Sequence, residues 1–342
     1  INMSAKISVV VPVYKIDEEL LRRCLQSLCN QTCDDAEFIV VDDGSPDNCG
    51  SVCDEYSSKE PRMHVIHTEN KGVSNARNAG IANSSAEYIL FVDGDDFVEN
   101  DLCEKCLNAV EQENVDILFF MHVTTKNPNL SVPETDKVTR LNDEEIEKIR
   151  LSVIAQSDPF EGYWVGPPWG KVFKRSLIEK NNLQYVLGLR KSQDRVFVLD
   201  YLFKANTAAL YSYCGYHYVS NEQSICHRYN KNIVSILESA QYEFAKRIYS
   251  ERAGKNEYDE AYNTMNLIFI SEFLTLNYAH KDNENSIKVI SKELNCLLNK
   301  PEYRSALRYG KMQNIGRKKR VLLYLLKCGW VQLAIIIGRR LL

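Results

Sequence analysis

Short apolar runs and amphipathic segments alternate through the first third of the chain. Apolar, β-branched runs are typical of buried strands, and they span residues 6–14, 37–45, 63–68, 88–92 and 115–123. Between them, apolar residues recur at helical spacing or follow helix-start signals, which predicts helices over 17–30, 47–59, 73–83 and 101–112. Strand and helix in strict alternation predict βαβ units, a parallel sheet and helices on both of its faces.

The pattern changes after about residue 124. Residues 124–138 are polar with two prolines, which indicates a loop, and 141–156 form an acidic amphipathic helix. A Gly/Pro-punctuated aromatic segment covers 162–178, a helix is expected within 189–205, and two short strands are expected at 207–213 and 216–220. From 232 onward the pattern is helical, with helices expected over 233–252, 256–278 and 285–298.

Polar and flexible residues follow the predicted parallel strands at the edge where such sheets bind ligands. The first strand ends in Pro12, Val13 and Tyr14, and the second in Asp42, Asp43, Gly44 and Ser45. The third is followed by Glu69, Asn70, Lys71 and Gly72, and the fourth by Asp93, Gly94, Asp95 and Asp96. The coincidence at one edge is more informative than any single motif.

The carboxylates Asp93, Asp95 and Asp96 stand close together directly after a buried strand. Like charges raise one another's pKa unless a cation or a hydrogen-bond donor offsets them. A metal such as Mg²⁺ or Mn²⁺, bound to a nucleotide diphosphate, would be such a cation. The alternative is a turn with solvated carboxylates.

Two further stretches fit a nucleotide site. A carboxylate at Asp43 can accept a hydrogen bond from the imide N–H of uracil; the alternative is a turn leading into a helix capped by Asp47. Gly72 permits close backbone approach at a helix start, and Arg77 would face the nucleotide or phosphate; the alternative is a solvated helix arginine.

Together these motifs resemble those of a known enzyme family. VVVPVYK, EFIVVDDGSPD, ENKGVSNARNAGI and EYILFVDGDDFV lie in order over about residues 7–101. They closely resemble the N-terminal half of family 2 glycosyltransferases, which have the GT-A fold. PPWGKVFKRSLI resembles a later family segment, and NEQSI (221–225) resembles the loop that covers the donor. Where many members carry Glu-Asp, this chain has Gln193-Asp194.

The resemblance assigns roles to individual residues. Asp194 would be the catalytic base, and Asp95 would ligate Mn²⁺ or Mg²⁺. The donor-binding residues would be Pro12, Val13 and Tyr14 at the nucleoside, Asp43 at uracil, Asn70, Gly72 and Arg77 at base and ribose, and Asp93 with Gly94 at ribose or sugar. Glutamine at 193 removes a negative charge and predicts a weaker electrostatic pull on the acceptor. Whether His217 or His227 reaches the metal stays open.

The resemblance implies an α/β fold of the GT-A, Rossmann-like type, with a mostly parallel sheet, flanking helices and a helical C-terminal region. We expect a catalytic domain over residues 1–230. Its nucleotide-binding half would cover about 6–123 and its acceptor-side half about 124–230. A helical region over 231–342 would end in a basic amphipathic helix.

Net charge and cysteine content do not change the expected class of protein. The 342 residues carry a net charge of −4, so no basic excess suggests nucleic-acid binding. Cys103 and Cys106 form a CxxC without a second pair, and free thiols in a reducing cytosol are expected. The N-terminus lacks a cationic segment followed by an apolar one, so we expect no signal peptide.

The C-terminal tail is basic and apolar. Arg317, Lys318, Lys319 and Arg320 precede an apolar stretch over 321–337, which is followed by Arg339 and Arg340. A span needs about 20 apolar residues, so a helix lying on an anionic membrane surface fits better. A core or dimer-forming helix is the alternative.

We therefore expect an inverting, metal-dependent glycosyltransferase. It would move a hexose or N-acetylhexosamine from a UDP-sugar to a saccharide, lipid-linked or protein-linked glycan. It would be cytoplasmic, and more specifically peripheral at the inner face of the plasma membrane, and a homo-oligomer is compatible with the sequence. The alternatives are a catalytically degenerate scaffold that binds glycan or nucleotide, and a nucleotidyltransferase, which usually carries a Gly-rich basic loop that VPVYKIDEE lacks.

Overall fold

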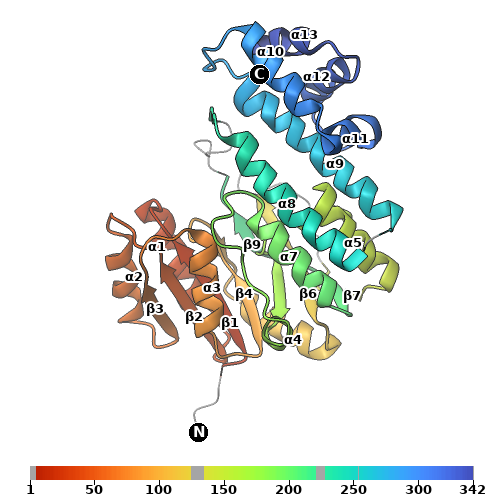
Figure 1. Cartoon of the computed structure of the whole chain (residues 1–342). Coiled ribbons are helices and arrows are strands. Elements are labelled where there is room, and N and C mark those ends of the chain that lie inside the picture. Colours follow the sequence, from red (N-terminus) through yellow and green to blue (C-terminus); the bar gives the residue numbers. More distant parts are fainter. Residues whose placement is uncertain (1–4, 125–134, 221–227, 253, 342) are drawn as a thin grey trace. The chain divides into compact units, whose positions relative to one another are not determined.

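The structure, a computed structural model of the chain, describes residues 5–124, 135–220, 228–252 and 254–341 (Figure 1). The chain divides into two compact units. The first consists of Ile1–Arg150, Asp158–Gly188 and Gln193–Asn221, and the second of Leu151–Ser157, Leu189–Ser192 and Glu222–Leu342. The second unit contains the predicted helical region after residue 230, together with two short earlier segments.

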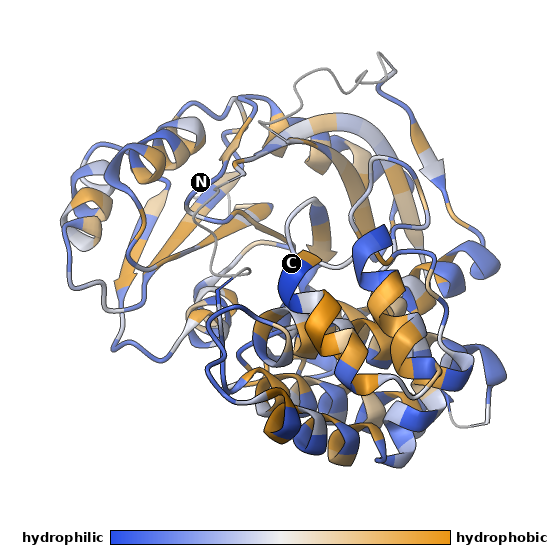
Figure 2. Cartoon of the chain, turned by 90° about the horizontal axis from the view of Figure 1, so that it is seen from above, coloured by the Kyte–Doolittle hydropathy of each residue, from blue (hydrophilic) through white to orange (hydrophobic). Residues whose placement is uncertain are grey.

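The first unit is built on one mixed sheet with the strand order β3-β2-β1-β4-β8-β6-β9-β5. Four strands are parallel neighbours, as predicted: β1 (Ile7–Val13), β2 (Ala36–Asp42), β3 (Met63–His67) and β4 (Tyr88–Phe91). β1 is buried along its whole length, which explains its unbroken apolar sequence. Figure 2 shows largely hydrophobic strands and hydrophilic loops beyond their ends.

The helices of the βαβ units follow the predicted pattern. They are α1 (Glu18–Cys29), α2 (Cys49–Ser57), α3 (Val73–Asn83) and α4 (Leu102–Glu113). The Asp17 carboxylate caps α1 by accepting from the backbone N–H groups of Glu19 and Leu20. The prediction that Asp47 caps the next helix is wrong by one residue. Asn48 holds the cap position of α2, and the Asp47 carboxylate accepts from the Cys49 N–H instead.

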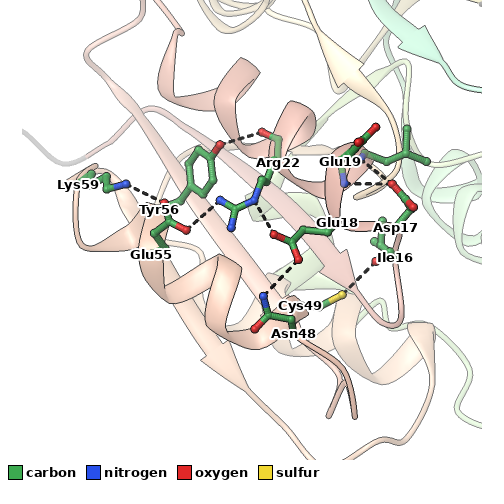
Figure 3. Close-up of polar contacts among 11 residues, drawn as sticks. Ile16, Asp17, Glu18, Glu19, Arg22, Asn48, Cys49, Glu55, Tyr56 and Lys59 are labelled. Atoms are coloured by element: carbon green, nitrogen blue, oxygen red, sulfur yellow. Dashed lines mark hydrogen bonds and ion pairs between the residues drawn. The ribbon is translucent and has the colours of Figure 1, made fainter.

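Polar contacts join α1 and α2 to each other and to the loop after β1 (Figure 3). Arg22 donates to both Glu18 and Glu55, each at 2.9 Å. The Cys49 thiol donates to the Ile16 carbonyl at 3.3 Å. Exposed ion pairs contribute at most about 1 kcal/mol each, so this network fixes the geometry of the loops more than it stabilises the fold.

The second half of the sheet differs from the prediction. β8 (Lys171–Lys174) lies antiparallel between β4 and β6 (Ile117–Thr124), so the predicted fifth parallel strand is not a neighbour of β4. The two strands predicted between 207 and 220 form one strand, β9 (Ala208–Tyr218). Its pairing with β6 shifts register near Met121 and Cys214. Such a bulge interrupts the alternation of apolar residues, which is why the sequence suggested two strands.

Short strands and helices complete the first unit. β5 (Phe97–Val98) and β7 (Val138–Arg140) both pair with β9 and were not predicted. The helices are α6 (Arg175–Lys180), α7 (Gln193–Lys204) and the first part of α5 (Asp143–Ala155), whose residues from Leu151 onward belong to the second unit. α7 presents Phe197 to the sheet, where its ring stacks on Tyr185 at 4.2 Å and meets Phe173 and Phe91 edge-on. This aromatic core fixes the start of α7, where Asp194 lies.

The second unit is helical. It contains α8 (Ile233–Arg252), α9 (Asn256–Phe273) with a π-helical turn over Leu274–Tyr278, and α10 (Ile287–Leu298). α11 (Pro301–Tyr309) was not predicted; Pro301 stands in its first turn, where a proline is tolerated. No helix among the described residues combines the length and apolar character that crossing a membrane requires.

The predicted single basic helix at the C-terminus is wrong. The tail forms two helices, α12 (Arg317–Lys327) and α13 (Val331–Leu341). Gly329 lies between them with φ of 76°, a left-handed conformation that glycine adopts without strain and that ends a helix. Much of the apolar tail is buried, including Leu322, Leu326 and Ile335.

Candidate active site

The loops after β1, β2 and β3 touch at the carboxyl ends of these strands. The Val13 carbonyl accepts from the Asp43 N–H at 2.9 Å. Gly44 has φ of 68°, and a Cβ there would lie 2.8 Å from the Asn70 N. Only glycine therefore permits this approach of the second and third loops. The convergence predicted from the strand ends is present.

Asp43 organises this corner. Its side chain is buried, and the carboxylate accepts from the Lys71 N–H at 3.1 Å and from the Gly72 N–H at 2.7 Å. Thr68 donates to the same carboxylate. Asp43 Oδ2 accepts only the Gly72 N–H among the described donors, so it keeps a lone pair for a ligand donor.

Asp42, the neighbouring carboxylate, faces a different partner. Its Oδ2 lies 3.0 Å from His67 Nδ1, and its Oδ1 accepts from the Ser45 N–H. Hydrogen bonds to Asp42 and Asp54 raise the pKa of His67. Asp42 is thus engaged by protein groups on both oxygens.

The end of β1 offers one accessible ring. Pro12 and Val13 are buried within the strand, whereas Tyr14 is 45% exposed. Gly94 packs against this segment, since a Cβ on it would lie 3.2 Å from the Pro12 carbonyl oxygen. The aspartate cluster therefore lies directly beside the loop that follows β1.

The carboxylates of the aspartate cluster are partly buried and repel one another. Burial and the nearby charge of Asp93 raise the pKa of Asp95. The same two causes, in the same order, raise the pKa of Asp96 to about 8. Asp96 is held by Tyr216, whose hydroxyl donates at 2.6 Å, and by the Val219 N–H at 2.7 Å. Asp93 and Asp95 are left to face a ligand.

Arg77 joins the cluster to Asp194. Its guanidinium donates to Asp93 Oδ1 at 2.8 Å and to Asp194 Oδ1 at 2.5 Å, and its side chain is only 4% exposed. Burial alone would lower the pKa of Arg77, but Asp194 and Asp93 raise it. The net pKa is well above the usual value, so the group stays charged. The alternative of a solvated helix arginine is therefore wrong.

Asp194 stands at the first turn of α7 with its side chain 27% exposed. Burial raises its pKa, and the Arg77 charge acts in the opposite direction. The preceding Gln193 has a buried Oε1 without a hydrogen-bond partner among the described residues. The structure thus brings Asp93, Asp95, Arg77 and Asp194 to one site, while Asn70 is exposed on the loop after β3.

Two buried residues of this site were missed. Tyr216 donates to Asp96 and accepts from the Asp93 N–H; its only sequence signal was an aromatic residue in an expected strand. Lys171 Nζ donates to the carbonyl oxygens of Trp164 and Pro167 at 2.8 and 2.6 Å. Burial lowers the pKa of Lys171 to about 7. Its signal was the lysine of the PPWGK motif.

A metal would find carboxylates here but no complete protein cage. Among the described residues, no three His, Cys, Asp or Glu side chains are grouped to hold an ion by themselves. Asp95 with Asp93 suits a hard cation that takes its other ligands from water and phosphate. His217 contacts Glu99 at 2.7 Å and stacks on Phe97. His227 and the segment 221–225 lie outside the described residues.

Comparisons with known proteins agree with this architecture. The family model described as "Glycosyl transferase family 2" matches residues 8–181. The "Putative glycosyltransferase EpsH" of Bacillus subtilis (strain 168) is 33% identical over 229 residues, which are 66% of this chain and 64% of that relative. The "Uncharacterized glycosyltransferase EpsJ" of the same organism is 27% identical over 330 residues, covering 95% of this chain and 92% of EpsJ.

A solved structure extends the likeness to the fold of nearly the whole chain. It is described as "S. aureus TarS 1-349 in complex with UDP-GlcNAc". The TM-score is 0.63 at 17% sequence identity, and the alignment covers 97% of this chain and 90% of the other. At this identity the likeness concerns the fold alone.

Proposed function

Because this chain belongs to glycosyltransferase family 2, we propose that it transfers a hexose or N-acetylhexosamine from a UDP-sugar to a glycan acceptor with inversion. One observation carries the proposal. Arg77 holds Asp93, from the end of β4, and Asp194, from the start of α7, on a single guanidinium. A carboxylate of the aspartate cluster and a candidate base are thereby held in a fixed position relative to each other.

The donor half of the proposal rests on the first two loops. The free lone pair of Asp43 Oδ2 would accept from the uracil imide, and the exposed Tyr14 would cover the nucleoside beside Pro12 and Val13. Asn70 and Gly72 would flank the ribose, with Asp93 and Gly94 beneath the sugar. The TarS structure with UDP-GlcNAc, of the same fold, makes a UDP-sugar the first donor to test.

A divalent cation fits the aspartate cluster. Burial and, after it, the nearby charge of Asp93 raise the pKa of Asp95, and a bound cation would offset both effects. Asp95 would hold Mn²⁺ or Mg²⁺, which when bound would neutralise the charge that develops on the departing diphosphate.

Asp194 would act as the general base. The acceptor oxygen attacks the anomeric carbon, the bond from that carbon to the diphosphate oxygen breaks, and the diphosphate leaves with the electron pair. Asp194 takes the proton of the acceptor hydroxyl, which is a poor nucleophile without a positioned base. A single displacement inverts the anomeric centre. The unpartnered Oε1 of Gln193 lies next to this base and would accept a second acceptor hydroxyl.

The acceptor is proposed to be a saccharide, lipid-linked or protein-linked, at the inner face of the plasma membrane. The exposed basic and aromatic residues of α12 and α13 would place the enzyme there. Trp330 and Tyr324 are 58% and 60% exposed, beside Arg317, Lys318 and Lys327. A packing surface for a second copy is the competing role of this pair of helices.

The test is calorimetric titration of UDP into the protein, with Mn²⁺ and then with EDTA. We expect micromolar binding that requires the metal. Asp95→Asn should weaken binding about 10- to 100-fold, the range seen when the support of a metal is disturbed. Glu144→Gln, which neutralises an exposed carboxylate on α5, is the matched control and should bind as the wild type does. If UDP binds equally well with Mn²⁺, with EDTA and in Asp95→Asn, the assignment of Asp95 as metal ligand is refuted. If UDP does not bind at all, the scaffold alternative is favoured.

A further inference from the structure

Two aromatic side chains beside the site expose ring surface. Trp164 is 38% exposed, and its ring lies 5.5 Å from that of the half-buried Tyr218 in an edge-on arrangement. Both rings also pack on Trp169, which is only 4% exposed. A tryptophan usually hides its large apolar surface, so an exposed one that rests on a rigid aromatic base calls for an explanation.

This aromatic pair is connected to the aspartate cluster through ring contacts. Trp169 stacks on Tyr216 with a centroid distance of 4.7 Å and an interplanar angle of 7°. The Tyr216 hydroxyl donates to Asp96 and accepts from the Asp93 N–H at 3.2 Å. Trp164 therefore lies two rings beyond the tyrosine that holds the aspartates, with Trp169 between them.

The backbone of Trp164 lies toward the candidate base. Gly166, two residues along, packs against Arg195, which follows Asp194; a Cβ on Gly166 would lie 2.8 Å from the Arg195 guanidinium carbon. Lys171 Nζ holds the Trp164 carbonyl oxygen, and its charge acts on Asp194. The segment of Trp164 thus contacts Arg195, the residue after the candidate base, while its ring is linked through Trp169 to the tyrosine that holds the aspartates.

The Trp164 ring rests on an ordered base. His122 packs against Trp164 at 4.4 Å, and burial lowers the pKa of His122 to about 4, so this imidazole is uncharged at neutral pH. Lys171 Nζ donates to the carbonyl oxygens of Trp164, Pro167 and Trp169 and so orders the segment. A surface ordered before binding loses little conformational entropy when a ligand stacks on it.

We propose that Trp164 and Tyr218 form an acceptor platform, on which the terminal pyranose of the acceptor stacks its C–H face. The inference rests on the proposed glycosyl transfer and assigns the acceptor subsite. The electron-rich ring face attracts the weakly positive C–H groups of a sugar, while the hydroxyl edge stays free to point to Asp194.

The test compares Trp164→Ala and Trp164→Phe with the wild type. The probes are methyl pyranosides of glucose, galactose and N-acetylglucosamine, with UDP release as the readout. Binding of each pyranoside to the UDP–Mn²⁺ complex is followed by saturation-transfer NMR. We expect Trp164→Ala to raise the acceptor KM about fivefold to tenfold, the worth of one stacking contact, and Trp164→Phe to retain most of the affinity. UDP affinity and hydrolysis of the UDP-sugar without acceptor should not change. Tyr242→Ala, which removes an exposed ring on α8, is the control.

The possible outcomes distinguish a failure of the platform from a failure of the proposed glycosyl transfer. A wild type that neither binds UDP nor hydrolyses a UDP-sugar overturns the proposed transfer. A wild type that does both, while Trp164→Ala leaves the acceptor KM and pyranoside binding within twofold, overturns the platform alone. Absence of pyranoside binding to the active wild-type complex also counts against the platform.

Discussion

At the scale of single residues, Arg77 sets the charge state of the site. Two nitrogens of its guanidinium donate to Asp194 and Asp93 separately, whereas lysine is shorter and places its donors on a single nitrogen, so it would contact the two carboxylates less well. Burial raises the pKa of Asp194, and the charge of Arg77 lowers it. Arg77→Lys weakens this second effect, so the pKa of Asp194 should rise further. The base must be deprotonated to work. We therefore expect the acid limb of the pH profile of kcat/KM to move upward by about one pH unit, measured by UDP release from pH 5 to 9.

Arg62→Lys is the matched control for that experiment. Arg62 is also partly buried and ion-paired, with Glu60, but it bonds the backbone carbonyls of Cys29 and Cys33 instead of the aspartates. Its replacement should leave the acid limb in place even if it costs stability. An unmoved limb in Arg77→Lys would mean that Asp194 does not control the ionisation seen in the rate.

Removing the base itself gives the sharper contrast. Asp194→Asn keeps the size of the side chain and its contact with Arg77 but cannot accept the acceptor proton. We expect transfer to fall about 10²- to 10⁴-fold while metal-dependent UDP binding stays within twofold. Calorimetry and UDP release on the same preparation measure both. Normal turnover by this variant would show the assignment of the base to be wrong.

The sequence predicted part of this site for a physical reason. Parallel strands bring their carboxyl ends to one edge, so Asp43 and Asp93 could be placed together from the pattern alone. The bond between Arg77 and Asp194 spans 117 positions and depends on how α7 packs, which no local pattern encodes. Tyr216 was missed for the same reason, because its role depends on β9 crossing to the aspartates.

At the scale of elements, prediction succeeded where neighbours in sequence are neighbours in space. α3 was predicted with its observed bounds, and the four parallel strands followed from the βαβ pattern. β8 inserts between β4 and β6 from a distant segment, which apolar periodicity cannot reveal. The break between α12 and α13 was missed because only Gly329 marks it. Its neighbours Cys328 and Trp330 are apolar, so the stretch looks continuous in the sequence.

The packing of α3 on β1 depends on one glycine. A Cβ on Gly80 would lie 2.2 Å from Val10 Cγ1, and Val10 is fully buried in the sheet with a stiff β-branched side chain. Gly80→Ala gains about 0.5–1 kcal/mol of helix propensity but overpacks the core by about 1–3 kcal/mol. We expect a net loss in the free energy of unfolding, measured by urea denaturation.

A double-mutant cycle isolates this contact. Val10→Ala alone leaves a cavity, which the methyl group of Gly80→Ala would partly fill. The pair should therefore be more stable than the sum of the single changes by about 0.5 kcal/mol or more. Gly316→Ala, where no atom lies within 4 Å of the added Cβ, is the control and should show no coupling with Val10→Ala, whatever it costs as the N-cap of α12. Additive effects of the two core changes would mean that Val10 does not limit the approach of α3.

At the scale of the whole molecule, charge is distributed unevenly. The chain has a net charge of −4, yet residues 303–342 contain ten Lys and Arg and no Asp or Glu. Within the second unit, α12 and α13 bury one apolar face and expose another, which includes Val321, Tyr324, Trp330, Leu333 and Ile336. Figure 2 shows both hydrophobic and hydrophilic residues on the helices next to the C-terminus. Exposed aromatic and basic residues together are typical of surfaces that lie on anionic lipid.

This distribution predicts salt-sensitive binding to vesicles that contain phosphatidylglycerol and none to pure phosphatidylcholine. Each basic residue near an anionic surface contributes about 1 kcal/mol, so Arg317→Gln, Lys319→Gln and Lys327→Gln combined should lower partitioning about 100-fold. The control combines Lys281→Gln, Lys288→Gln and Lys292→Gln, exposed lysines of the same unit outside the tail, and should change partitioning much less. Co-sedimentation measures both. A different outcome would overturn the membrane role: the wild type does not bind the vesicles, and Trp330→Ala dissociates a dimer in sedimentation equilibrium. The exposed apolar residues of this surface would then serve contact between copies of the chain, and its basic residues would not bind lipid.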